Sequence, residues 1–180
     1  ELSRHQTLAR HCQIAEIAAI ISMCGGVSIS EKDHYSLKIQ TENVYVARKY
    51  FTLLKKTFNI KTDVSVRQGM ENRSSRIYSV CIRKHEDAIR VLQAAKLIDL
   101  YGEIEENLSL AQNVVIRKSC CKRAFIRGAF LAAGSISDPE KFYHFEIACA
   151  TEAKAKQIQG LILSMGIEAK IVLRKKYFVV

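Results

Sequence analysis

The sequence has 180 residues, of which 48% are hydrophobic, and its one proline and eight glycines exclude a disordered or collagen-like chain. This length and apolar content predict a sizeable core, in one large domain or two small ones. The formal net charge of +10 favours a polyanionic partner, most often a nucleic acid, although a charge that serves only solubility explains part of it.

Hydrophobic periodicity predicts alternating helices and hairpins along the first half of the chain. We expect, in order, a helix at 3–23, strands at 27–31 and 35–40, a helix at 44–58, strands at 62–67 and 76–83, and a helix at 86–97. In the second of these strands, Leu37 and Ile39 share one face. Lys38 and Gln40 are therefore expected on the opposite face.

The second half of the chain repeats the first. A shift of 109 residues places the segment 12–28 on 121–137, and a similar shift places 59–67 on 166–174. Each copy therefore predicts helix, strand, strand, helix, strand, strand, and the last helix of the first copy has no counterpart. Two hairpin-based antiparallel sheets with helices behind them make an α+β fold with approximate two-fold symmetry.

The duplication also predicts how the chain is divided. We expect a first repeat at 1–100, a linker at 101–119 and a second, truncated repeat at 120–180. The chain begins with Glu1 and ends in a pattern typical of a strand interior, so we expect a fragment of a longer protein.

The first helix of each copy is rich in small residues and ends in glycine, at Gly25 and at Gly134. Small side chains let two helix backbones approach closely, so we expect these helices to pack on each other at the pseudo-two-fold axis. A terminal glycine is typical of a left-handed turn that leads into a strand. Either helix alone would be interpreted as an ordinary alanine-rich core helix.

These two helical segments resemble degenerate copies of the LAGLIDADG motif of homing endonucleases. The resemblance implies central motif helices, a saddle of antiparallel sheets over DNA, and one acidic metal ligand just before each glycine. Here those positions hold Cys24 and Ala133, and the earlier acidic positions hold Ser22 and Leu131. Because magnesium requires carboxylate oxygens, the resemblance implies no catalytic residues, no metal and no cofactor, so the protein is not expected to be an enzyme.

The segment 120–147 and the first motif helix are similar to the bacterial WhiA family. The resemblance implies a non-catalytic, DNA-binding transcriptional regulator of sporulation, cell division and chromosome segregation, whose C-terminal helix-turn-helix domain is absent here. An alternative is a protein-interaction module that docks a partner such as a sigma factor while the helix-turn-helix binds DNA. Residual nuclease activity is a third hypothesis, but it requires ligands that the motif lacks.

If the saddle faces double-stranded DNA, its polar face carries the contacts. The residues expected to bind DNA are Lys38, Gln40, Arg67, Arg73, Arg76, Lys170, Arg174, Lys175 and Lys176. A second basic cluster consists of Arg117, Lys118, Lys122, Arg123 and Arg127. This cluster binds a phosphate near the pseudo-axis or simply charges an exposed first turn. All of these charges are equally explained, one by one, as solvated surface residues.

No segment predicts export or a membrane partner, because the most apolar run, 14–23, contains Glu16 and is too short to span a bilayer. The six cysteines lie in apolar segments without a CxxC pair. We therefore expect reduced, buried thiols and no zinc site, with the adjacent Cys120 and Cys121 a weak redox candidate. The expected location is cytoplasmic and nucleoid-associated.

Overall fold

A computed structural model describes residues 1–180 except 6, 31–33, 70–74, 99–112, 139 and 141–143. The first repeat consists of α1 (Arg10–Cys24), β1 (Gly25–Ile29), β2 (Tyr35–Thr41), α2 (Val44–Phe58), β3 (Asp63–Gln68), β4 (Arg76–Ile82) and α3 (His85–Ala95). The second consists of η2 (Asn113–Ile116), α4 (Ser119–Ala133), β5 (Gly134–Ile136), β6 (Phe145–Cys149), α5 (Glu152–Leu163), β7 (Val172–Arg174) and β8 (Tyr177–Val179).

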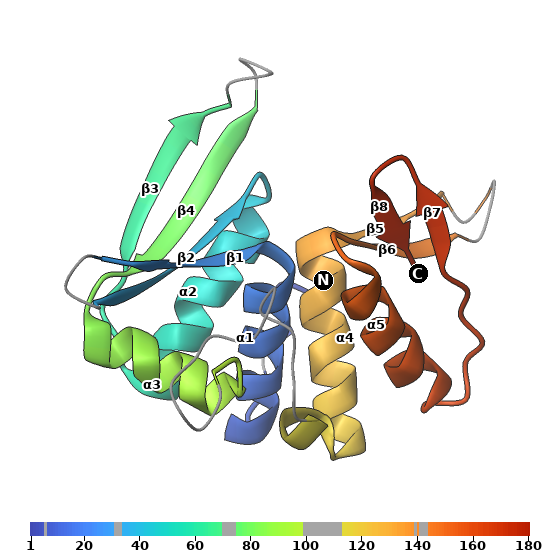
Figure 1. The fold of residues 1–180 in the computed structure, drawn as a ribbon, viewed down its shortest axis with the longest axis horizontal. Helices are drawn as coiled ribbons and strands as arrows, with labels where there is room; N and C mark the ends of the chain where they lie inside the picture. Colours follow the sequence, from blue (N-terminus) through green and yellow to red (C-terminus); the bar gives the residue numbers. More distant parts are fainter. Residues whose placement is uncertain (6, 31–33, 70–74, 99–112, 139, 141–143) are drawn as a thin grey trace.

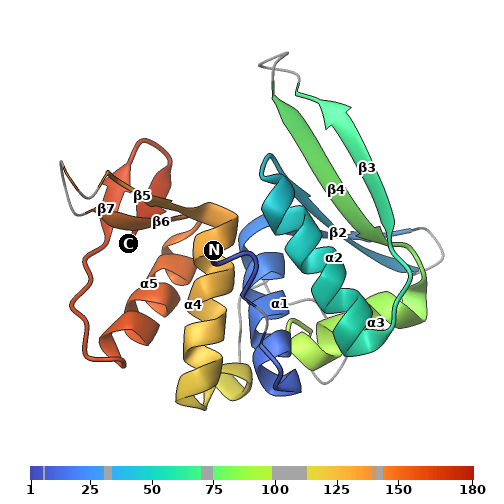
Figure 2. The same ribbon diagram turned by 180° about the vertical axis from the view of Figure 1, so that it is seen from behind.

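The two repeats have the same topology. Their four-stranded sheets are ordered β1-β2-β4-β3 and β5-β6-β8-β7, and every pairing in both is antiparallel. Helices α1 and α4 lie side by side in the centre, with the sheets above them and α2, α3 and α5 flanking them (Figures 1 and 2). The predicted duplicated α+β fold is confirmed. Most of the expected linker at 101–119 lies outside the described residues.

Helices α1 and α4 approach each other closely at small residues. A Cβ atom added to Gly128 of α4 would lie 2.7 Å from the Glu16 carbonyl oxygen and 2.9 Å from the Ala19 Cβ atom of α1. The shift of 109 residues places Ala19 on Gly128, so equivalent positions of the two repeats meet here. The expected packing of the two helices on each other is therefore confirmed.

The glycines that end these helices have a different role from the predicted one. Gly25 (φ −91°, ψ 160°) and Gly134 (φ −92°, ψ 156°) are extended, not left-handed. Each is glycine because a Cβ atom would clash with its own helix, at the carbonyl oxygens of Ile21 and Phe130. Left-handed residues instead follow other helices, at Asn59 (φ 55°) after α2, Lys96 (φ 56°) after α3 and Gly166 (φ 80°) after α5.

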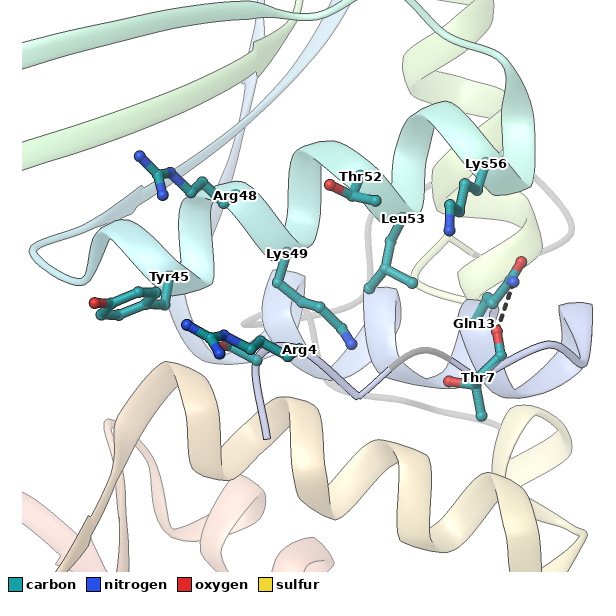
Figure 3. A pocket seen from close by; sticks show the side chains of 10 residues that line it. Arg4, Thr7, Gln13, Tyr45, Arg48, Lys49, Thr52, Leu53 and Lys56 are labelled. Atoms are coloured by element: carbon teal, nitrogen blue, oxygen red, sulfur yellow. Dashed lines mark hydrogen bonds between the residues drawn. The ribbon is translucent and has the colours of Figure 1, made fainter. Parts of the chain in front are cut away.

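The first helix begins at Arg10, later than the predicted start at Ser3. The preceding segment is held against α1 and α2 by side chains that bind its backbone. The Lys49 ammonium donates to the His5 carbonyl oxygen, and the Gln13 amide nitrogen donates to the Thr7 carbonyl oxygen at 2.8 Å (Figure 3). Because these carbonyl groups bind side chains, the segment does not continue the helix toward the N-terminus.

A buried ion cluster joins the two repeats around Glu16, whose side chain is fully buried. Its carboxylate lies 3.2 Å from Arg127 Nε of α4 and 3.4 Å from Lys49 Nζ of α2. It also accepts a hydrogen bond from the Thr7 hydroxyl at 3.3 Å. Arg127 therefore belongs to the interior, and the expectation that it charges an exposed first turn is wrong.

Candidate nucleic-acid interface

The helices pack against one face of the first sheet, and the other face is open (Figure 1). Strand β2 alternates across these faces: Leu37 and Ile39 are fully buried, whereas Lys38 is half-buried and Gln40 is exposed. The predicted phase of β2 is therefore confirmed. Lys38 and Gln40 lie on the open face.

The strand register places Arg67 on the same face as Lys38. Residues directly opposite each other in an antiparallel pair share a face. Cys81 of β4 is paired with Lys38 of β2 on one side and with Asp63 of β3 on the other, so these three residues share a face. Arg67 lies four residues after Asp63 in β3, and it therefore lies on the same face as Asp63. Among the described residues, neither Lys38 nor Arg67 forms an ion pair.

The remaining basic residues expected in the first repeat are arranged differently. Arg76 pairs with Gln68 and lies on the face opposite Arg67, so the register separates it from Lys38. It is nevertheless exposed, because the β3–β4 hairpin projects beyond the helices (Figure 1). Arg73 lies outside the described residues.

The basic residues of the second sheet are partly neutralised. Arg174 Nη1 lies 2.9 Å and 3.0 Å from the two carboxylate oxygens of Glu146. The exposed Lys175 and Lys176 form the turn between β7 and β8, where Lys175 has a left-handed φ of 54° and Lys176 lies over the Tyr177 ring. Lys170 is exposed ahead of β7.

Cys24 and Ala133 are the last residues of α1 and α4, directly below the two sheets (Figure 1). The Cys24 thiol donates to the Ile20 carbonyl oxygen at 3.2 Å, and burial raises the pKa of this thiol to about 12. The buried Lys154 ammonium donates to the Ser22 carbonyl oxygen, where it complements the negative end of α1. Desolvation lowers the pKa of Lys154.

A neutral thiol and an ammonium group therefore lie at the end of α1. The sequence pattern does not indicate a role for Lys154, because its contact with Ser22 arises only when α5 packs against the core. Among the described residues, the one group of side chains that could hold a metal ion consists of His11, Cys12, Cys120 and Cys121. It lies at the opposite ends of α1 and α4.

The other four residues of the second basic cluster lie at the end of α4 far from the sheets. Arg117, Lys118 and Arg123 are exposed, and Lys122 donates to the Ser164 hydroxyl at 2.9 Å. A separate hollow of about 200 Å³ lies between the N-terminal segment and α2 (Figure 3). The basic residues that line it are Arg4, Arg48, Lys49 and Lys56, none of which the sequence singled out. Within the described residues, no helix has the length and apolar content of a membrane span.

Comparison with known proteins identifies this architecture. The model of the WhiA N-terminal LAGLIDADG-like domain matches residues 10–98, and that of the WhiA LAGLIDADG-like domain matches residues 122–180. Proteins named "Probable cell division protein WhiA" from Lachnoclostridium phytofermentans and Lachnospira eligens are 47% and 39% identical over the whole chain. The chain spans 57% and 56% of their lengths, so it corresponds to about half of these relatives.

Solved structures have the same fold. The N-terminal LAGLIDADG domain of WhiA matches with a TM-score of 0.70 at 17% identity, over 100% of this chain and 79% of that one. The homing endonuclease I-DmoI, in complex with DNA and Mn, matches with a TM-score of 0.63 at 14% identity, over 95% of this chain and 89% of that one. The curated relatives are named as cell division proteins and not as nucleases. This chain belongs to the WhiA family and has its duplicated LAGLIDADG-like fold.

Proposed function

We propose that this domain binds double-stranded DNA without cutting it, and that it serves a transcriptional regulator of bacterial cell division, sporulation and chromosome segregation. The observation that carries the proposal is the pair of cations Lys38 and Arg67, which share the open face of the first sheet and have no ion-pair partner among the described residues. I-DmoI and I-WcaI, which have this fold, are bound to DNA in their structures. The proposed location is accordingly the nucleoid, in the cytoplasm.

The electrostatics of the first sheet support DNA binding. Unpaired cations on an open face can neutralise phosphates and release the condensed counterions of the duplex. The exposed Gln40 and Ser65 accompany them on this face, where both are paired with the buried Ser79 of β4. Such side chains hydrogen-bond to phosphate oxygens and base edges. The net charge of +10 adds long-range attraction for a polyanion.

The chemistry at the ends of the central helices supports binding without cleavage. Metal-assisted phosphodiester hydrolysis needs oxygen ligands for a divalent cation. Cys24 and Ala133 supply no carboxylate, and the raised pKa of Cys24 keeps it an uncharged thiol. The nearby Lys154 ammonium would repel a divalent cation bound at the same place.

The test is fluorescence anisotropy of a labelled duplex across a salt series. We expect binding that weakens linearly with the logarithm of salt concentration. The double variant Lys38→Ala/Arg67→Ala is expected to lower the slope by about 1.8, at roughly 0.9 per lost phosphate contact. The control is Arg48→Ala/Lys55→Ala, which removes the same charge from exposed positions on α2.

Two results would contradict the proposal. Absence of binding at low salt would remove the DNA claim for this domain. Equal slopes for the two double variants would show that the open sheet face is not the contact surface. Circular dichroism of each variant verifies the fold, and intact supercoiled plasmid after incubation with magnesium is the result expected for a non-catalytic domain.

Docking of a partner protein, such as a sigma factor, is the second candidate function. It is favoured by the apolar exposure of the second repeat. The large apolar side chains exposed there are Ile136, Phe145, Leu163, Ile167, Val172, Leu173 and Tyr177. Pairing of Arg174 with Glu146 also leaves this sheet less basic. The test is binding of a purified sigma factor to the domain and to its Leu173→Lys variant. Binding that the substitution abolishes, in a domain that does not bind DNA, would favour this function over the first.

A further inference from the structure

Four side chains with metal-binding atoms lie close together at the N-terminal ends of the central helices α1 and α4. His11 and Cys12 belong to the first turn of α1, and Cys120 and Cys121 to the first turn of α4. Their potential ligand atoms all lie within 4.8 Å of one another. The His11 Nδ1 atom is 3.2 Å from the sulfur atoms of both Cys12 and Cys121.

The duplication explains how this cluster forms. The shift of 109 residues that relates the repeats places His11 on Cys120 and Cys12 on Cys121. The pseudo-two-fold packing of α1 on α4 therefore brings two equivalent pairs together. The expectation of no zinc site rested on the absence of a CxxC pair, and that criterion does not detect a cluster to which each repeat contributes only half of the side chains.

The donor set matches the chemistry of a structural zinc site. Three cysteine sulfurs and one histidine nitrogen form a Cys₃His set, which binds Zn²⁺ tetrahedrally. Zinc bond lengths of about 2.0–2.3 Å imply separations of about 3.5–3.8 Å between ligand atoms. The observed separations, from 3.2 Å to at most 4.8 Å, reach this geometry by side-chain adjustment of about 1 Å or less.

The ends of the two helices favour thiolate ligands. Neither α1 nor α4 has an acidic residue in its first turn, and neither has a side-chain cap. The positive ends of the helix dipoles favour anionic sulfur at these positions, and they oppose the effect of burial, which raises the pKa of the Cys12 and Cys121 thiols. A zinc ion with three thiolates carries a net charge of −1, which also suits the neighbouring Lys118 and Lys122.

The burial of the four side chains provides both rigidity and access. Cys12 and Cys121 are buried, whereas His11 and Cys120 are exposed, so an ion can enter from the solvent side. We propose that His11, Cys12, Cys120 and Cys121 bind one zinc ion, which clasps the N-terminal ends of α1 and α4 together. This site is remote from the sheets and independent of the proposed DNA contacts.

The first measurement is the metal content of the 180-residue chain, purified under reducing conditions and analysed by elemental mass spectrometry. We expect about one zinc ion per chain, and tetrahedral cobalt absorption with sulfur charge-transfer bands after replacement with Co²⁺. The variants Cys120→Ser and His11→Ala, at exposed positions, are expected to lose the ion. Cys81→Ser, which changes a cysteine outside the cluster, is expected to retain it.

The second measurement does not depend on how the variants fold. Chelation of zinc from the wild-type chain is expected to lower Tm by about 5–10 °C, reversibly, if zinc is held at about 100 times its Kd. A chain that folds but contains no zinc and takes up no Co²⁺ would overturn the proposal. A disulfide between Cys12 and either cysteine of α4 in a chain isolated without added reductant, formed by air oxidation in the presence of zinc and in place of metal binding, would overturn it as well.

Discussion

The carboxylate of Glu16 offers a sharp test of how the two repeats are held together. We expect Glu16→Gln to destabilise the domain severely, although it changes only one oxygen for nitrogen. The substitution removes the negative charge that faces Arg127 at 3.2 Å and Lys49 at 3.4 Å. The side chains of Lys49 and Arg127 are only 4% and 13% exposed, so water cannot replace the lost partner.

The magnitude follows from the burial of the cluster. Removal of one partner of a buried ion pair costs about 3–5 kcal/mol because the remaining charge stays desolvated. This is a large part of the roughly 5–15 kcal/mol that stabilises a typical domain. The matched control is Glu152→Gln, whose carboxylate lies 2.8 Å from Lys156 but is 56% exposed. A helix-surface pair of this kind contributes about 0.5 kcal/mol or less.

Urea unfolding followed by circular dichroism measures both changes. We expect the free energy of unfolding to fall by at least about 2.5 kcal/mol more for Glu16→Gln than for the control. Similar losses for the two variants would refute the reasoning, because they would mean that the Glu16 cluster is as well hydrated as a surface pair. Metal-free samples of each protein separate this effect from any contribution of bound zinc.

Two further predictions concern the helices. Gly128→Ala should destabilise the domain by about 1–3 kcal/mol, because the added Cβ atom would lie 2.7 Å from the Glu16 carbonyl oxygen. The control Gly160→Ala adds a Cβ atom in open space and should stabilise α5 by about 0.5–1 kcal/mol. Urea unfolding that gives both changes the same sign would contradict the steric argument. The pKa of Lys154 is lower in the folded state than in the unfolded chain. Between the folded pKa and about pH 10.5, the unfolded chain therefore binds more protons than the folded one, so the free energy of unfolding should rise with pH in the wild type relative to Lys154→Met. Parallel pH profiles of the unfolding free energy for the two proteins would exclude this contribution.

The sequence by itself determined the features that depend on local pattern. Alternation fixed which face of β2 carries Lys38 and Gln40, because successive side chains of a strand point to opposite sides. Self-similarity fixed the duplication and the order of elements, because each repeat folds from the same succession of helix and hairpin signals. Local pattern did not fix the start of α1, since tertiary hydrogen bonds to the carbonyl oxygens of His5 and Thr7 decide it.

Only the tertiary structure decided which distant residues meet. Glu16 and Arg127 form an ion pair, and His11 lies against Cys121, although more than 100 residues separate the members of each pair. These contacts arise from the packing of α1 on α4, and that packing depends on the small residues at the crossing and not on the helical propensity of either segment. Neither His11–Cys12 nor Cys120–Cys121 is a recognisable metal-binding motif by itself. The packing of α1 on α4 brings the two pairs into the geometry of a four-ligand site.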